Sequence, residues 1–174
     1  DPQEYAEFHG IDSAAKSEGE GSKEGFLKLL LKAPSAFWTV GLVQFFCWAA
    51  FMYMWTYTNG AVADTCWHTT EPSSPGYQAA GNWVGVLFAV QAVGSMIWAL
   101  IIPKFRSLKS AYSVSLLVGA VGFISVYFFH NQYLLFVSFL MIGAAWAAML
   151  AIPFTILTNS PSGDHIGTYL GLFN

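Results

Sequence analysis

Long stretches without charge constrain this chain more than any other feature. Between Lys32 and Lys104 the only acidic or basic residues are Asp64 and Glu71. Charged residues make up 10% of the chain and hydrophobic residues 55%, whereas a soluble domain carries about 25% charged residues. Uncharged apolar runs of about 20 residues are what a helix needs to cross the roughly 30 Å hydrocarbon core of a bilayer. The sequence therefore predicts an all-α membrane protein.

Four apolar runs are long enough to cross the bilayer, and a fifth begins near the end of the chain. We expect transmembrane helices at about 35–58, 81–103, 110–129 and 133–157, with the next starting at 167. Residues 1–25 are polar and are predicted to form a cytoplasmic linker. In residues 26–34, apolar side chains alternate with Lys28 and Lys32 at helical spacing, which predicts an amphipathic helix at the membrane surface.

The basic residues predict which side of the membrane each connection faces. All seven occur in the amino-terminal tail or between the second and third spans: Lys16, Lys23, Lys28, Lys32, Lys104, Arg106 and Lys109. Lysine and arginine concentrate on the cytoplasmic side of membrane proteins. We therefore expect an integral protein of the cell (inner) membrane whose tail and basic turn are cytoplasmic. Aromatic residues near span ends, such as Tyr112 and Tyr133, are expected to be interfacial anchors.

The predicted spans contain no Asp, Glu, Lys, Arg or His. Ionisable groups inside a membrane usually form proton and ion pathways, so we do not expect a complete coupling site in this chain. His68, His130 and His165 lie in separate connections, without an HExxH motif or paired carboxylates. The sequence therefore predicts no enzyme, no metal site and no cofactor.

Neutral polar and aromatic side chains are the groups left to bind a ligand. Gln44, Trp48 and, further along, Trp55 or Phe51 lie near one stripe of a helix. Amides can match sugar hydroxyls as donors and acceptors, and apolar walls with a few polar groups are typical of ligand pockets. The alternative for Gln44 is a hydrogen bond between helices, worth about 1 kcal/mol or less. The predicted substrate-binding residues in the spans are Gln44, Trp48, Tyr53, Trp55, Asn59 and Gln91.

Three local signals concern helix ends, bends and contacts. Asn59 and Gly60 are predicted to break the first span, either as an ordinary left-handed helix end or as an unwound segment lining a cavity. Pro153 removes one backbone hydrogen bond and should kink the fourth span. Small residues at helical spacing predict close helix packing; they include Gly81 with Gly85, Gly119 with Gly122, Gly143 with Ala147, and Gly167 with Gly171.

Several stretches together resemble a known family. They are FWTVGLVQFFCWAAFMYMWTYTNGAVAD, GNWVGVLFAVQAVGS, the basic turn PKFRSLKS and GTYLGLFN. They look like the carboxy-terminal half of sucrose-type sugar transporters of the major facilitator superfamily, related to the glycoside, pentoside and hexuronide cation symporters. The resemblance covers about residues 25–174. It implies that residues 35–174 form part of the carboxy-terminal six-helix bundle of a twelve-helix fold, and that the chain is part of a longer protein.

The resemblance also implies a function. Proteins of this family commonly carry a mono- or disaccharide across the membrane together with protons, by alternating access between two halves. The expected partners are therefore a sugar, protons, the lipid bilayer and the missing amino-terminal half of the same chain, and no nucleic acid. Gln44 and Trp48 would face the sugar, Asn59 would lie near the outer gate, and Asn174 would approach the cavity from the eleventh helix.

Two other functions remain open at this point. A major facilitator transporter could carry another neutral solute, or the chain could be a membrane scaffold that transports nothing. The scaffold predicts that Gln44, Trp48 and Gln91 point into helix contacts, whereas the transporter predicts that they line one face accessible to water. In the transporter, Lys104, Arg106 and Lys109 would help to close the cytoplasmic side by pairing with other groups or with lipid.

Overall fold

The computed structural model describes residues 28, 30–159 and 166–173. Helices make up 86% of these residues and no strand occurs among them, so the described chain is all-α, as predicted. Four of the helices are long and apolar enough to cross a membrane. In chain order the elements are α3 (Ser35–Trp67), α4 (Pro75–Ile101), the short 3-10 helix η1 (Ile102–Lys104), α5 (Leu108–Phe128), α6 (Leu135–Thr158) and α7 (Ile166–Phe173). The predicted linker, residues 1–25, and parts of 26–34 lie outside the described residues.

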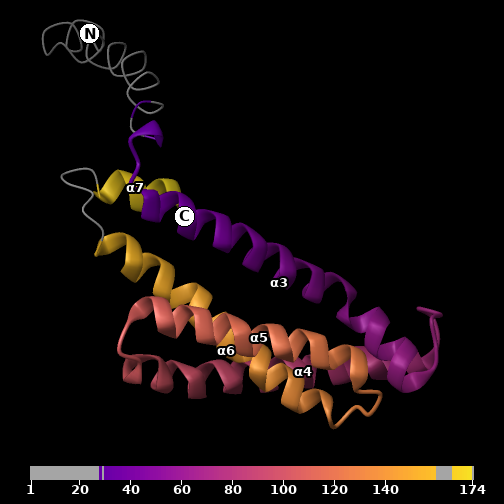
Figure 1. Ribbon diagram of the computed structural model, residues 1–174. Coiled ribbons are helices and arrows are strands. Elements are labelled where there is room, and N and C mark those ends of the chain that lie inside the picture. The colour runs from indigo at the N-terminus through magenta and orange to yellow at the C-terminus, as the bar shows by residue number, and fades with distance from the viewer. Residues whose placement is uncertain (1–27, 29, 160–165, 174) are drawn as a thin grey trace, which may run out of the picture.

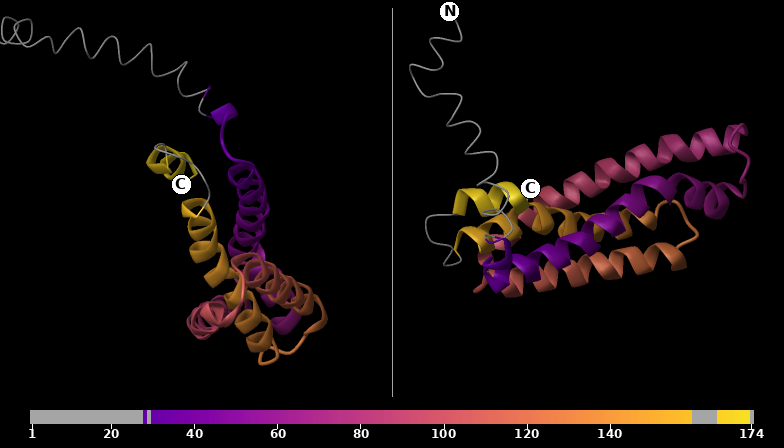
Figure 2. Two further views of the ribbon diagram at one scale, coloured as in Figure 1. Left: turned by 60° about the vertical axis from the view of Figure 1, so that its left-hand side comes forward. Right: turned by 90° about the horizontal axis from the view of Figure 1, so that it is seen from above.

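Helix α6 lies at the centre of the bundle. It packs along α4 on one side and along α5 on the other (Figure 1). In its most apolar 18-residue window 56% of the residues are buried, against 17% for α3 and for α4, so α6 holds the group together. Helix α3 runs at an angle to α4, α5 and α6, as the two views in Figure 2 show. Near its start, Phe37 packs with Leu157 of α6 and Tyr169 of α7 in a second, smaller core.

Glycines allow α6 to approach its neighbours closely. A Cβ atom built on Gly94 of α4 would lie 2.5 Å from the carbonyl oxygen of Leu140, and one on Gly143 of α6 would overlap the carbonyl oxygen of Gln91. Backbone atoms cannot rotate away as a side chain can, so these contacts require glycine. The predicted close packing is confirmed at Gly119, Gly122 and Gly143. It is wrong at Gly85, Gly167 and Gly171, where a Cβ would meet no described atom within 4 Å.

The predicted helix break at Asn59 and Gly60 is wrong. Helix α3 continues through both residues and ends after Trp67, with His68 in the left-handed conformation at φ 51°. Glycine inside a helix costs about 1 kcal/mol relative to alanine. The next turn offsets this cost, because Val62 and Ala63 are 2% and 0% exposed in the main core. The first span therefore ends nine residues beyond the predicted end at 58.

The connection between α3 and α4 is correspondingly short. The predicted spans 35–58 and 81–103 left residues 59–80 between them, whereas the observed connection comprises only the residues between Trp67 and Pro75. Ser74 precedes α4 as its N-cap, and its hydroxyl accepts a hydrogen bond of 3.2 Å from the backbone N–H of Tyr77. Pro75 then occupies the first helical turn, where its missing N–H costs nothing. This Ser-Pro start places the beginning of α4 six residues before the expected position at 81.

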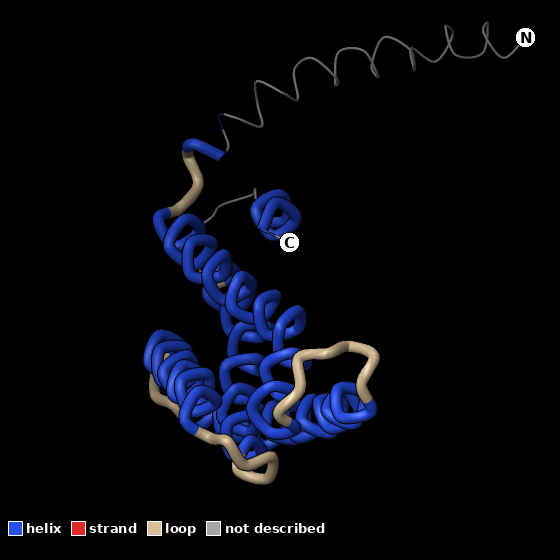
Figure 3. The backbone as a smooth tube through the Cα atoms, turned by 90° about the vertical axis from the view of Figure 1, so that its right-hand side faces the viewer, coloured by secondary structure: helices blue, strands red, loops and turns tan. Residues whose placement is uncertain are grey.

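Helices α3 and α4 are longer than a bilayer requires. At about 1.5 Å per residue, the 33 residues of α3 and the 27 residues of α4 extend about 50 and 40 Å, against about 30 Å of hydrocarbon. The two helices meet at the end of the bundle that is turned toward the viewer in Figure 3. We call the last turns of α3, the turn after it and the first turns of α4 the α3–α4 hairpin. Asp64 lies in this hairpin and is exposed, outside the apolar middle of α3.

The opposite end of the bundle carries the basic residues. Lys104 and Arg106 lie between α4 and α5, and Lys109 lies in the first turn of α5. This end of the bundle also holds the start of α3 and α7 (Figure 1). All three are exposed, and none forms an ion pair within the described part of the chain. We call this end the basic end. The sequence prediction that these residues share one side with the start of the first span agrees with this arrangement.

Candidate functional site

Three tryptophans from two helices form one aromatic wall. Trp48 and Trp55 of α3 lie 5.9 and 5.5 Å from Trp146 of α6, measured between ring centroids, and 6.3 Å from each other. Phe51 packs against this group, with its ring centroid 4.9 Å from that of Trp146. Because Trp48 and Trp55 are seven residues apart on α3, they lie on one side of the helix. We call Trp48, Trp55 and Trp146 the indole wall.

The indole wall keeps its polar atoms unused. None of its three N–H groups donates a hydrogen bond within the described residues. Two other tryptophans do donate: Trp83 to the carbonyl oxygen of Gln132, in the turn before α6, at 3.2 Å, and Trp98 to the hydroxyl of Ser115 in α5 at 2.8 Å. Trp48 and Trp55 are both 41% exposed. Their Cα atoms lie about 20 and 30 Å from the start of α3, and therefore in the middle of the helix. An unpaired N–H that faced lipid at that depth would be costly.

A hollow of about 480 Å³ lies next to one edge of the indole wall. Its volume falls within the range of about 300–1,000 Å³ typical of ligand pockets. Gln44 and Trp48 line it from α3, and Leu172 and Phe173 line it from α7. No charged side chain is among its lining residues, which are Phe37, Trp38, Gly41, Leu42, Gln44, Phe45, Trp48, Leu172 and Phe173.

Gln44 lines this hollow, but its amide also bonds to two other helices. Its Nε2 donates to the carbonyl oxygen of Met149 in α6 at 3.0 Å. The hydroxyl of Tyr112 in α5 donates to its Oε1 at 2.9 Å. Gln44 is 9% exposed and Tyr112 7%, so both bonds are buried. A primary amide has two N–H hydrogens, so a ligand bond to the second one is compatible with this network.

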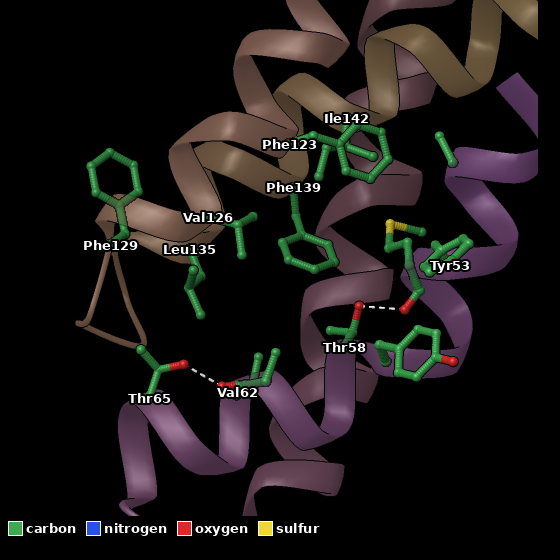
Figure 4. A pocket seen from close by; sticks show the side chains of 14 residues that line it. Tyr53, Thr58, Val62, Thr65, Phe123, Val126, Phe129, Leu135, Phe139 and Ile142 are labelled. Carbon is green, nitrogen blue, oxygen red and sulfur yellow. Dashed lines mark hydrogen bonds between the residues drawn. The ribbon is translucent and has the colours of Figure 1, made fainter. Parts of the chain in front are cut away.

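Tyr53 lies on a different face of α3. At about 100° per residue, it is rotated about 140° from Trp48, and it lines an apolar cavity of about 260 Å³ between α3, α5 and α6 (Figure 4). The hydroxyls of Thr58 and Thr65 in this cavity donate to backbone carbonyls of α3 itself, those of Met54 and Ala61. Few polar groups are therefore left there for a ligand with many hydroxyls.

Two further predicted residues lie at contacts with α4: Asn59 where α3 meets α4, and Gln91 where α4 meets α6. Asn59 packs against Gly81 of α4, and its Oδ1 is buried without a hydrogen-bond partner among the described residues. It shares a helix face with Trp55, one turn further from the basic end. Gln91 is 6% exposed in α4, where its backbone carbonyl meets Gly143 of α6. The structure thus brings Gln44, Trp48 and Trp55 together and leaves Tyr53 and Gln91 apart from them.

The remaining predicted residues do not join this group. Asn174 lies outside the described residues. Lys104, Arg106 and Lys109 lie at the basic end, in or beside the turn between α4 and α5. No group of three or more His, Cys, Asp or Glu side chains that could hold a metal occurs in the described segments.

Two residues of this region, Trp146 and Tyr112, carry no local signal of their role in the sequence. Trp146 was not singled out, because a single tryptophan in a uniformly apolar helix gives no sign of the face on which it lies. Tyr112 was expected to be an interfacial anchor and is instead buried and bonded to Gln44. Its partner is 68 positions away in the sequence, a separation at which helical periodicity carries no information.

Comparison of this chain with models of protein families, with curated proteins and with solved structures gives no match. Membership of the major facilitator superfamily therefore stays a prediction from the sequence motifs quoted above. What the described residues show is an all-helical fold with four helices that are long and apolar enough to cross a membrane.

Proposed function

We propose that this chain is part of a secondary transporter that moves a neutral sugar, a mono- or disaccharide, across the membrane. The observation that carries the proposal is the indole wall, whose N–H groups are unused, beside a hollow lined by Gln44. Transport would be proton-coupled symport by alternating access, in which one bundle of helices rocks against another around a central site. The second bundle would be the amino-terminal half implied by the family resemblance.

The chemistry of the hollow favours a neutral ligand with several hydroxyl groups. Indole rings offer broad apolar faces on which the C–H face of a sugar ring can pack, and their N–H groups can donate to hydroxyls. An anion or a cation would require a charged partner to offset its desolvation, and no charged side chain lines the hollow. A neutral ligand avoids that cost.

A non-transporting scaffold is the second candidate, and the bonds of Gln44 favour it. This amide joins α3 to α5 and α6, as the scaffold predicts. The scaffold leaves the three N–H groups of the indole wall without a partner, whereas a bound hydroxyl group would accept from them. The two candidates therefore differ in what they predict for Trp48.

Uptake of labelled mono- and disaccharides tests the proposal. The full-length protein in proteoliposomes with an imposed proton gradient is compared with Trp48→Leu, which keeps apolar bulk but removes the ring and its N–H. Phe46→Leu is the matched control, because Phe46 is an exposed aromatic residue of α3, 64% exposed, that lines neither the wall nor the hollow. Aromatic stacking is worth about 0.5–1.5 kcal/mol beyond area burial, so the KM of Trp48→Leu should rise about two- to tenfold.

Three outcomes are informative. A raised KM in Trp48→Leu with an unchanged KM in Phe46→Leu supports a sugar site at the wall. Equal effects of both substitutions, or none, remove Trp48 from the site. Uptake of another neutral solute, with no uptake of any sugar, would keep the transporter and reject its substrate class.

A further inference from the structure

The proline of α6 leaves one backbone carbonyl without its helical partner. In an α-helix the carbonyl oxygen of residue i accepts from the N–H of residue i+4. Pro153 has no N–H, so the carbonyl of Met149 loses that bond. Met149 is 0% exposed, so water cannot replace the missing donor. An unpaired buried carbonyl is costly, so another group has to pair with it.

Gln44 of α3 provides the missing donor. Its Nε2 donates to the Met149 carbonyl oxygen at 3.0 Å, from a position 105 residues away in the sequence. Tyr112 of α5 donates to the Oε1 of the same amide at 2.9 Å. The two bonds fix the orientation of the amide, because its oxygen faces the tyrosine and its nitrogen faces the carbonyl. Three helices therefore meet at the one point where α6 lacks its own backbone bond.

We propose that Gln44 is a latch on a proline hinge in α6. While the Gln44 amide holds the Met149 carbonyl, the turn of α6 that leads into Pro153 is tied to α3. When that bond breaks, no backbone donor of α6 replaces it, because Pro153 has no N–H, so the segment of α6 after Pro153 bends more freely about the proline. Leu157, beyond the hinge, packs with Phe37 of α3, so the hinge and this small core move together.

A double-mutant cycle on the full-length protein tests the latch. Gln44→Met keeps the length of the side chain and removes the donor, whereas Pro153→Ala restores a backbone N–H for the Met149 carbonyl. The four proteins are wild type, each single variant and the double variant, and thermal unfolding in detergent is measured for each. The cycle cancels any independent effect of straightening α6.

The latch predicts a specific pattern. Gln44→Met should lower the unfolding midpoint by about 2–6 °C, and the same substitution should lower it by less than half as much in the Pro153→Ala background. Equal losses in both backgrounds would overturn the proposal. If Gln44→Met does not accumulate as folded protein, recovery of folded protein in the double variant supports the latch, and continued absence refutes it.

Hydrogen exchange provides a readout that a general loss of stability would not reproduce. Amide exchange of peptides covering 154–158 should become severalfold faster in Gln44→Met and return to the rate of the single Pro153→Ala variant in the double variant. Peptides from the middle of α5, around Gly119, should keep their exchange rates. A uniform increase across α5 and α6 would show that Gln44 stabilises the bundle without acting on the hinge.

The latch does not depend on the proposed transport. Thermal unfolding and hydrogen exchange need no substrate, so the latch can be supported even if no sugar is transported. The reverse also holds, because sugar uptake that is sensitive to Trp48→Leu would stand if the double-mutant cycle showed no coupling.

Discussion

From the close contact between α4 and α6 we predict how much stability the substitution Gly143→Ala would cost. In Gly143→Ala the new Cβ would lie 2.7 Å from the backbone nitrogen of Ser95 and 3.0 Å from the carbonyl carbon of Gly94. Ordinary contacts to carbon lie at about 3.5–4.0 Å. The two helices must therefore separate by roughly 1 Å at this point. The same movement stretches the hydrogen bond from the Ser95 hydroxyl to the Gly143 carbonyl, now 2.9 Å long.

The expected loss follows from two opposing effects. Forcing an extra methyl group into a packed interface costs about 1–3 kcal/mol. Replacing glycine by alanine inside a helix returns about 0.5–1 kcal/mol. Because the new methyl group meets backbone atoms, the packing cost lies in the upper part of its range, about 2–3 kcal/mol. The net loss should therefore be about 1–2.5 kcal/mol, and the midpoint of thermal unfolding should fall by about 2–10 °C, at about 2–4 °C for each kcal/mol.

Gly85→Ala is the matched control for this prediction. Gly85 lies in α4, as Gly94 does, but a Cβ there would meet no described atom within 4 Å. Only the gain in helix propensity remains, so the unfolding midpoint should stay unchanged or rise slightly. Both variants are measured by thermal unfolding of the full-length protein in detergent. A midpoint for Gly143→Ala at or above that of wild type would refute the close contact between α4 and α6.

Two further substitutions test the ends of α3 and α4. Ser74→Ala removes the hydroxyl that accepts from the N–H of Tyr77, and should cost about 0.5–2 kcal/mol; an unchanged unfolding midpoint would show that α4 does not depend on this cap. His68→Gly relieves a left-handed residue at φ 51° and should raise stability by about 1 kcal/mol, measured by the same unfolding experiment. A lower midpoint in His68→Gly would mean that the histidine side chain makes a stabilising contact.

The sequence predicted the membrane helices well because their signal is local. Each span is a continuous apolar run, and the bilayer requires a certain length, so hydropathy alone locates α5 and α6 to within about two residues. The end of α3 was misplaced because Asn59 and Gly60 are typical helix terminators. The burial of Val62 and Ala63 extends the helix past them, and burial depends on partners in other helices.

The candidate site was predictable only in part. The stripe of Gln44, Trp48 and Trp55 follows from helical geometry within α3. Trp146 comes from a different helix, and nothing in the local sequence shows that it meets Trp48 and Trp55. The bond from Gln44 to Met149 was hidden for another reason, because its acceptor is a backbone carbonyl that becomes unpaired only through Pro153. A sequence can show that a proline frees a carbonyl, but it does not show which side chain binds it.

The length of the α3–α4 hairpin has a practical consequence. A turn of only a few residues joins two helices that are longer than the hydrocarbon is thick, and hydrogen bonds of Thr69 and Ser74 stabilise that turn. An antibody fragment would therefore find a firm epitope there, at the end away from Lys104, Arg106 and Lys109. Such a complex would add mass and shape to a small particle embedded in a micelle, which is what electron cryomicroscopy needs in order to align its images.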